Sequence, residues 1–180
     1  DPSFCHQVVC MTAPQMGNYG ITPFDEESAR PQVAGFVVRS LSEPHNWRSV
    51  EPLQAYLERH GIPGLYDVDT RAITRLLRER GAQRGILAPG KREAGDLQRA
   101  ACAWPGFDDL DLAAVVTCRE PYRLEPASPP CEARALRQST YALAPSDGVR
   151  GDGLRIVAYD FGVKRNILER MAARGCEVIV

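Results

Sequence analysis

The stretch that most constrains the fold lies between residues 155 and 180. Residues 155–160 are mostly apolar and rich in β-branched side chains, which predicts a strand buried on both faces. Residues 163–173 repeat apolar side chains at helical spacing, and Gly175 stands where the residue just beyond a helix end belongs. Residues 176–180 predict a second strand. This β-α-β order is typical of an α/β protein with an open parallel sheet.

Two strands cannot bury such a sheet by themselves, so we expect the chain to stop inside a domain. Val157, Ile167, Leu168 and residues 178–180 are then expected to lie uncovered, making this end of the chain mobile or prone to association. The other end begins Asp-Pro-Ser-Phe without a Met, so we expect a segment of a longer protein, truncated at both ends.

Composition excludes several classes of protein. With 180 residues, 44% of them hydrophobic and 25% charged, the chain is of ordinary globular composition and long enough for one domain plus part of another. The formal charge of −1 gives no basic excess to attract nucleic acid or anionic lipid. No apolar run approaches the roughly 20 residues of a membrane span. We expect a cytoplasmic protein.

The six cysteines are scattered, with no C-x-x-C pair and no His at ligand spacing, so a zinc site is not expected. We interpret them as reduced cytosolic thiols. The alternative for any one of them, a catalytic nucleophile, requires a His partner, and none of the three histidines lies in a recognisable nucleophile motif. The cysteines are Cys5, Cys10, Cys102, Cys118, Cys131 and Cys176.

The first half of the chain predicts alternating strands and helices. Residues 7–11 and 32–39 read as buried strands, and the glycines in the loop at 13–20 indicate a specified backbone shape. Ser49 is the expected cap of a helix that Gly61 closes. Further expected elements are a brief apolar segment at 65–68, a strand at 85–88, a helix at 97–103 and an apolar segment at 110–116.

The strongest predicted helix starts at a cap formed by Asp69 or Thr70 and stops at Gly81. Its buried stripe is expected to be Ile73, Leu76 and Leu77. Arginines occupy the rest of the helix, and they fit either a solvated face or a basic patch for phosphate or an acidic partner. These arginines are Arg71, Arg75, Arg78 and Arg80.

Two acidic stretches each allow a plain and a functional interpretation. Residues 25–27 (Asp-Glu-Glu) predict a solvated acidic turn, and the alternative is a carboxylate pair for a metal or for acid–base chemistry. Residues 160–162 (Asp-Phe-Gly) share their letters with the magnesium motif of protein kinases, but no glycine-rich loop or His-Arg-Asp motif accompanies them. They predict a turn into a helix, whose N-terminus can hold an anion.

The amino-acid composition changes at residue 118, after which prolines and glycines become frequent. We interpret residues 118–153 as a connection in which any strand would be an edge strand. The predicted organisation is therefore a first domain at residues 1–152, including this linker, and the start of a second domain at residues 153–180.

Four stretches identify a family by their order along the chain. They are residues 1–4 (Asp-Pro-Ser-Phe), residues 14–20 (Pro-x-x-Gly-Asn-Tyr-Gly), residues 67–83 (beginning Asp-Val-Asp-Thr-Arg) and residues 157–168 (containing Ala-Tyr-Asp-Phe-Gly-Val-Lys-Arg-Asn). Together they resemble the small chain of glutamine-hydrolysing carbamoyl-phosphate synthase. The resemblance implies a layered, swivelling-type β/β/α domain followed by the first β-α-β of a flavodoxin-like class I glutamine amidotransferase sheet.

The resemblance also implies an activity. Such a small chain hydrolyses glutamine and passes ammonia to a large chain, which uses ATP, Mg and bicarbonate to make carbamoyl phosphate for arginine and pyrimidine synthesis. The family's catalytic Cys, His and Glu match no position here, so we expect no metal, no cofactor and no catalytic residue in these 180 residues, which should be inactive alone. Cys176, at the start of a strand without elbow glycines, is not that nucleophile.

One functional position of the family falls in this chain. Ser3, in the Asp-Pro-Ser motif, matches a serine that contacts bound glutamine, and a hydroxyl can donate and accept as that substrate requires. The plain alternative is that Ser3 only caps a turn after Pro2. For the whole protein, the alternative to an enzyme is a non-catalytic docking domain with a degenerate amidotransferase half. A flavodoxin-like nucleotide binder is disfavoured because no glycine-rich phosphate loop follows the strand at 155–160.

Overall fold

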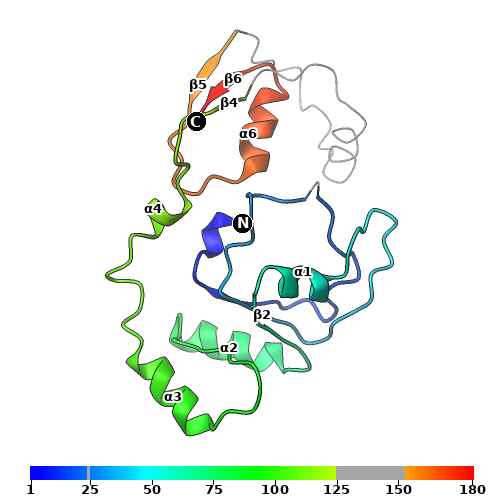
Figure 1. Ribbon diagram of the computed structural model, residues 1–180, viewed down its shortest axis with the longest axis vertical. Coiled ribbons are helices and arrows are strands. Elements are labelled where there is room, and N and C mark those ends of the chain that lie inside the picture. The colour runs from blue at the N-terminus through cyan, green and yellow to red at the C-terminus, as the bar shows by residue number, and fades with distance from the viewer. Residues whose placement is uncertain (24, 125–152) are drawn as a thin grey trace. The chain divides into compact units, whose positions relative to one another are not determined.

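The computed structural model describes residues 1–23, 25–124 and 153–180 (Figure 1). The chain divides into two compact units, each built from segments that are separate in sequence. Unit 1 contains Asp1–Ser3, Pro23–Arg30 and Leu112–Val180, and unit 2 contains Phe4–Thr22 and Pro31–Asp111.

Unit 2 contains a parallel sheet with the strand order β1-β2-β3. The strands are β1 (Val8–Cys10), β2 (Gly35–Val37) and β3 (Gly64–Leu65), and helix α1 (Leu53–Arg59) connects β2 to β3. The two strands predicted at 7–11 and 32–39 are therefore confirmed, although both are shorter than their apolar runs.

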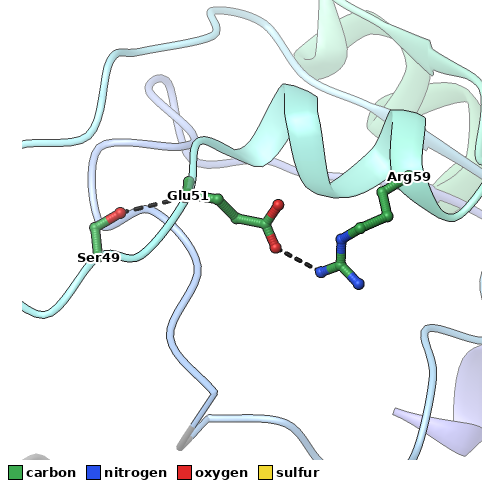
Figure 2. A network of polar contacts seen from close by, with 3 residues as sticks. All are labelled: Ser49, Glu51 and Arg59. Atoms are coloured by element: carbon green, nitrogen blue, oxygen red, sulfur yellow. Dashed lines mark hydrogen bonds and ion pairs between the residues drawn. The ribbon is translucent and has the colours of Figure 1, made fainter.

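The start of α1 differs from the prediction. Pro52, with φ of −68°, occupies the N-cap position, and no side chain caps the helix. Because proline presets a helical φ and has no N–H, the helix begins directly after it. The Ser49 hydroxyl instead donates to the Glu51 carbonyl at 3.2 Å, and the Glu51 carboxylate pairs with Arg59 at the far end of α1 (Figure 2). Ser49 is thus not the cap.

The loop at residues 13–20 has the specified shape that its glycines predict. Gly17 and Gly20 have φ of 96° and 65°, in the left-handed region that disfavours other residues. A Cβ on Gly20 would overlap the side chain of Ser49, so the space as well as the dihedral angle requires glycine there.

Helix α2 (Thr70–Arg80) begins and ends as predicted. The Asp69 carboxylate accepts a hydrogen bond from the Ala72 N–H at 3.0 Å, which makes Asp69 the N-cap. Gly81, with φ of 74°, ends the helix.

The apolar stripe of α2 is less buried than predicted. Ile73 and Leu77 are half-buried, Leu76 is 42% exposed, and Thr70 is the one α2 residue that is fully buried. The helix therefore packs on unit 2 through its first turn and one edge, because Thr70 and Thr74 lie on that side and are joined by a 2.7 Å hydrogen bond.

The segment after α2 contains one wrong prediction. Residues 85–88 form no strand; instead the Leu87 side chain lies over Gly35 of β2, in the space where a Cβ on that glycine would stand. An apolar segment that packs onto a strand gives the same sequence signal as one that pairs with it. Helices α3 (Ala94–Ala103) and α4 (Leu112–Val116) follow, the first of them longer than expected.

Unit 1 contains the predicted β-α-β arrangement. Strands β5 (Arg155–Val157) and β6 (Glu177–Ile179) are parallel and are connected by helix α6 (Arg165–Ala172). The prediction that the first of these strands is buried on both faces is wrong, because α6 covers only one face and Val157 of β5 is 65% exposed. Strand β4 (Arg123–Leu124), from the beginning of the proline-rich stretch, adds to β6 in the antiparallel direction. The strand order β4-β6-β5 puts β6 in the centre, so β4 is an edge strand, as expected for this stretch.

The core of unit 1 lies between α6 and β6. Leu168, Ala172, Cys176 and Val178 are 2%, 0%, 6% and 0% exposed, with Leu124 of β4 packed against them. The expectation that Leu168 and Val178 are uncovered is therefore wrong, because the helix and the third strand cover one face. It is confirmed for two other residues: Val157 is 65% exposed and Ile167 46% exposed.

The observed elements confirm a mixed α/β fold with small parallel and mixed sheets. The swivelling-type and flavodoxin-like assignments, and the domain boundary at residues 152 and 153, stay predictions. The predicted linker beyond residue 124 lies outside the described residues. Among the helices that the structure describes, none has the length and apolar character to cross a membrane.

Candidate functional site

Ser3 lies on a short 3₁₀ turn, η1 (Pro2–Phe4), at the start of the chain. Its backbone N–H donates a 3.0 Å hydrogen bond to Oδ1 of Asp1. Pro2 is buried while Ser3 is exposed, so the turn is anchored by one residue and presents the next to solvent.

The carboxylate of Asp1 is held from the other side by Lys164. Lys164 Nζ lies 2.8 Å from Asp1 Oδ2, and the lysine directly precedes α6. The side chain of Lys164 is 46% exposed, so this ion pair contributes little to stability, under about 1 kcal/mol. Its effect is geometric: both carboxylate oxygens of Asp1 are engaged, one by the Ser3 backbone and one by the start of α6.

Glu27 caps the same helix end, although it lies 139 residues away in sequence from its partner Asn166. Its Oε2 accepts from the Asn166 N–H at 2.9 Å, and its carbonyl accepts from the Arg165 N–H at 3.0 Å. Helix α6 has no acidic residue in its first turn and no cap from Lys164, so Glu27 provides the negative charge that a helix N-terminus favours.

The acidic turn at 25–27 is therefore not simply solvated, because Glu27 is committed to α6. An anion bound at the start of this helix, the alternative for residues 160–162, would compete with a carboxylate of the protein itself.

Asp160 organises the turn between β5 and α6. Its Oδ1 accepts from the N–H groups of Gly162 and Val163 at 2.9 and 3.0 Å, and its Oδ2 accepts from the Cys118 N–H at 2.8 Å. Burial opposes ionisation of the carboxyl, but the three backbone donors outweigh it and hold the pKa of Asp160 below its ordinary value. The Asp-Phe-Gly stretch is thus a turn into a helix, as predicted.

Gly162 brings this turn against the residue next to Ser3. Its φ is 93°, and a Cβ built on it would lie 2.8 Å from Val116 Cγ2 and 3.0 Å from Pro2 Cβ. Only a glycine allows the two turns to approach so closely. The position of Ser3 is therefore set by Pro2, by Asp1 and by the turn that leads into α6.

Neither Cys10 nor Cys118 has the environment of an activated nucleophile. Burial and the neighbouring Asp160 carboxylate raise the pKa of the Cys118 thiol, and burial raises the pKa of the Cys10 thiol, whereas nucleophilic thiols have lowered values. Cys176 is a core residue of unit 1. The cysteines in the described ranges form no disulfide bond, and Cys131 lies outside those ranges. In those ranges no three His, Cys, Asp or Glu side chains are grouped to hold a metal ion.

Sequence reasoning singled out Ser3 but missed the residues that position it. Asp160 had a local signal, because an Asp two residues before a glycine and at the start of a helix commonly accepts from the following N–H groups. Lys164 and Glu27 had no local sequence signal for their roles, since their partners are more than a hundred residues away.

Comparison with known proteins assigns the class. Residues 1–87 match the family model for the carbamoyl-phosphate synthase small chain, CPSase domain. Over its whole length the chain also aligns with curated members of that family at 40 to 42% identity. The chain is therefore similar along its whole length to carbamoyl-phosphate synthase small chains.

Three relatives illustrate the match, each carrying the name carbamoyl phosphate synthase small chain. Those of Thermosynechococcus vestitus and of a Synechococcus species are 42% identical to this chain, which covers 45% and 44% of their lengths. The protein of Syntrophotalea carbinolica is 41% identical, with 46% of its length covered. All of this chain takes part in each alignment, so it spans just under half the length of these relatives.

Proposed function

We propose that this chain is part of a protein that supplies ammonia for carbamoyl phosphate synthesis. The whole protein hydrolyses glutamine to glutamate and delivers the ammonia to a large chain in the cytoplasm. That large chain uses ATP, Mg and bicarbonate, so this chain itself carries no cofactor. The observation that carries the proposal is similarity along the entire chain, at 42% identity, to proteins named carbamoyl phosphate synthase small chain.

Within that function we assign Ser3 to glutamine binding. Ser3 is exposed, its hydroxyl can both donate and accept, and its backbone is fixed through Asp1 to Lys164. A residue that binds a ligand must be held in a fixed position, and the contacts through Asp1 and Lys164 hold the backbone of Ser3 in this way. The turn is also held by side chains of the same unit as α6, an element of the amidotransferase half in our assignment.

The chemical step belongs to residues outside these 180 positions. We assign it to the family's Cys nucleophile with its His and Glu, in which a thiolate attacks the amide carbon and backbone N–H groups hold the oxyanion. Residues 153–180 then begin the flavodoxin-like amidotransferase domain, and residues 1–152 belong to the swivelling-type domain.

The test compares two nitrogen sources in the full-length protein paired with its large chain. Carbamoyl phosphate formation from glutamine should require both chains, whereas formation from ammonium should require only the large chain. The matched control is the small chain with its nucleophilic cysteine changed to serine, which should remove the first activity and retain the second. A full-length small chain that binds the large chain but releases no glutamate would instead favour the docking domain.

A further inference from the structure

A depression of about 650 Å³ lies on unit 2, and four arginines line it. Arg71, Arg75 and Arg78 come from α2, and Arg39 follows β2. The remaining lining is small and mostly polar: Thr12, Pro14, Thr70 and Thr74.

The helical arginines form a row. They occupy positions i, i+4 and i+7, so they lie on one side of α2 and span about 10 Å along its axis. Arg80, the fourth arginine of the helix, does not line the depression.

This row places like charges side by side, and no described carboxylate pairs with them. Like charges four residues apart on a helix are destabilising, and Arg39 adds a further positive charge. No Asp or Glu among the described residues forms an ion pair with any of these four arginines, although other arginines of the chain are paired. The formal charge of the whole chain is only −1, so the positive charge is a local feature.

We propose that this arginine depression docks an acidic segment of the large chain, an inference that rests on the proposed function. Carboxylates on one face of a helix recur about every 6 Å and on one face of a strand about every 6.6 Å, which matches the spacing of the row. The row extends about 10 Å along the helix axis, so an acidic segment with several carboxylates can engage more of its arginines than a single phosphate group can. The guanidinium group also pairs with carboxylates through two parallel hydrogen bonds, and arginine is enriched at protein interfaces.

The experiment uses full-length small chains and measures their affinity for the large chain at two salt concentrations. Arg75→Glu should weaken binding about tenfold or more, and Arg75→Glu combined with Arg78→Glu should weaken it further. The matched control is Arg80→Glu, which makes the same charge change on the same helix outside the depression, and it should stay within about twofold of the unchanged protein. Higher salt should reduce the difference between the variants, because exposed charges are screened.

Several results would overturn the inference. Equal losses in Arg75→Glu and Arg80→Glu would indicate general charge attraction. A loss of thermal stability in isolated Arg75→Glu that Arg80→Glu does not show would place the acidic occupant within the small chain. Saturable binding of inorganic triphosphate, lost in Arg75→Glu while large-chain affinity is unchanged, would indicate a phosphate ligand.

The proposed function fails separately. If the unchanged small chain neither binds the large chain nor supports synthesis from glutamine, both ideas are wrong. If the unchanged chain does both and the arginine variants bind equally well, only the docking inference is wrong.

Discussion

At the scale of single residues, the backbone and the side chain of Ser3 can be tested separately. The backbone N–H is held by Asp1, so Ser3→Ala should leave the turn in place and remove only the hydroxyl. If Ser3 binds glutamine as proposed, losing one or two hydrogen bonds, at about 0.5 to 1.5 kcal/mol each and more for a charged group, should raise the KM for glutamine roughly 3-fold to 100-fold. Steady-state kinetics of the full-length enzyme measure this.

Synthesis from ammonium should be unchanged in Ser3→Ala, because that route bypasses the glutamine site. Ser28→Ala is the matched control, since Ser28 belongs to the same unit and its hydroxyl donates to the Arg30 carbonyl. If the kinetics of Ser3→Ala with glutamine equal those of the unchanged enzyme, Ser3 has only a structural role in the turn. Equal loss with both nitrogen sources would point to misfolding or poor subunit docking.

Gly162 is where two turns meet, and substituting it tests that contact. Gly162→Ala combines an unfavourable φ of 93° with close approaches to Val116 and Pro2, so it should destabilise the protein by about 2 to 5 kcal/mol. Gly153→Ala controls for the dihedral angle alone: its φ is 80° and no atom lies within 4 Å of the added Cβ, predicting about 1 to 2 kcal/mol. Urea denaturation that gives equal losses for the two would argue against the packing of Gly162 on Pro2.

Asp160 predicts a dependence of stability on pH. Its pKa is lowered in the folded protein, so its contribution is fully present above the unfolded value of about 3.9 and is lost as pH falls through the folded value. Asp160→Asn should be less stable than the unchanged protein at neutral pH. When the pH falls from 5, about one unit above 3.9, the variant should lose less stability than the unchanged protein. Denaturation curves across this range that fall in parallel for both proteins would contradict the assignment.

At the scale of elements, α2 depends on its cap. Asp69→Ala removes the carboxylate that accepts from the Ala72 N–H, and we expect a loss of about 0.5 to 2 kcal/mol in the free energy of unfolding. Asp69→Asn keeps an oxygen that can accept this hydrogen bond, so it should cost only about a few tenths of a kcal/mol. If Asn and Ala are equally destabilising, the charge rather than the cap stabilises the helix.

The elements also show what local sequence can and cannot predict. Helices α2 and α6 were predictable because their signals lie within a few residues: the Asp69 cap and Gly81 at the two ends of α2, and the apolar spacing in both helices. Gly175 follows α6 two residues beyond its C-cap, Ala173, rather than directly after the helix end as predicted. The strand predicted at 85–88 was wrong because an apolar segment lying over Gly35 and one pairing in a sheet have the same composition.

The candidate site divides in the same way. Ser3 was found through a motif, and the shape of the Asp160 turn has a local signature. The cap that Glu27 provides and the ion pair of Lys164 depend on which distant segments meet, which no local pattern records. The burial of Leu168 and Val178 was missed for the same reason, since β4 comes from a stretch predicted to be a linker.

At the scale of the whole molecule, unit 1 exposes large apolar side chains. Val157 lies on β5, an edge strand of the described sheet, and an edge with exposed apolar residues is a template for pairing. We therefore expect the 180-residue chain to self-associate with rising concentration in sedimentation experiments. The exposed residues are Leu154 (59%), Val157 (65%), Tyr159 (83%), Phe161 (73%) and Ile167 (46%).

Val157→Lys should reduce this association, because a lysine on an edge strand opposes pairing with another chain. Val50→Lys, at an equally exposed position (67%) of unit 2, is the matched control and should have little effect. A chain that stays monomeric at every concentration, or a response equal in both variants, would mean that the β5 edge does not mediate association.

The hydrogen bonds from the start of α6 to Glu27 also set an order of events during synthesis. Asn166 is translated 139 residues after its partner Glu27. The separation between Lys164 and its partner Asp1 is larger still. At a ribosomal rate of about 5 to 20 residues per second, the turn that carries Ser3 waits roughly 10 to 30 seconds before the groups that fix it exist. Ser3 is among the earliest residues of this chain to be translated, but the contacts of its turn are complete only once the start of α6 has been made.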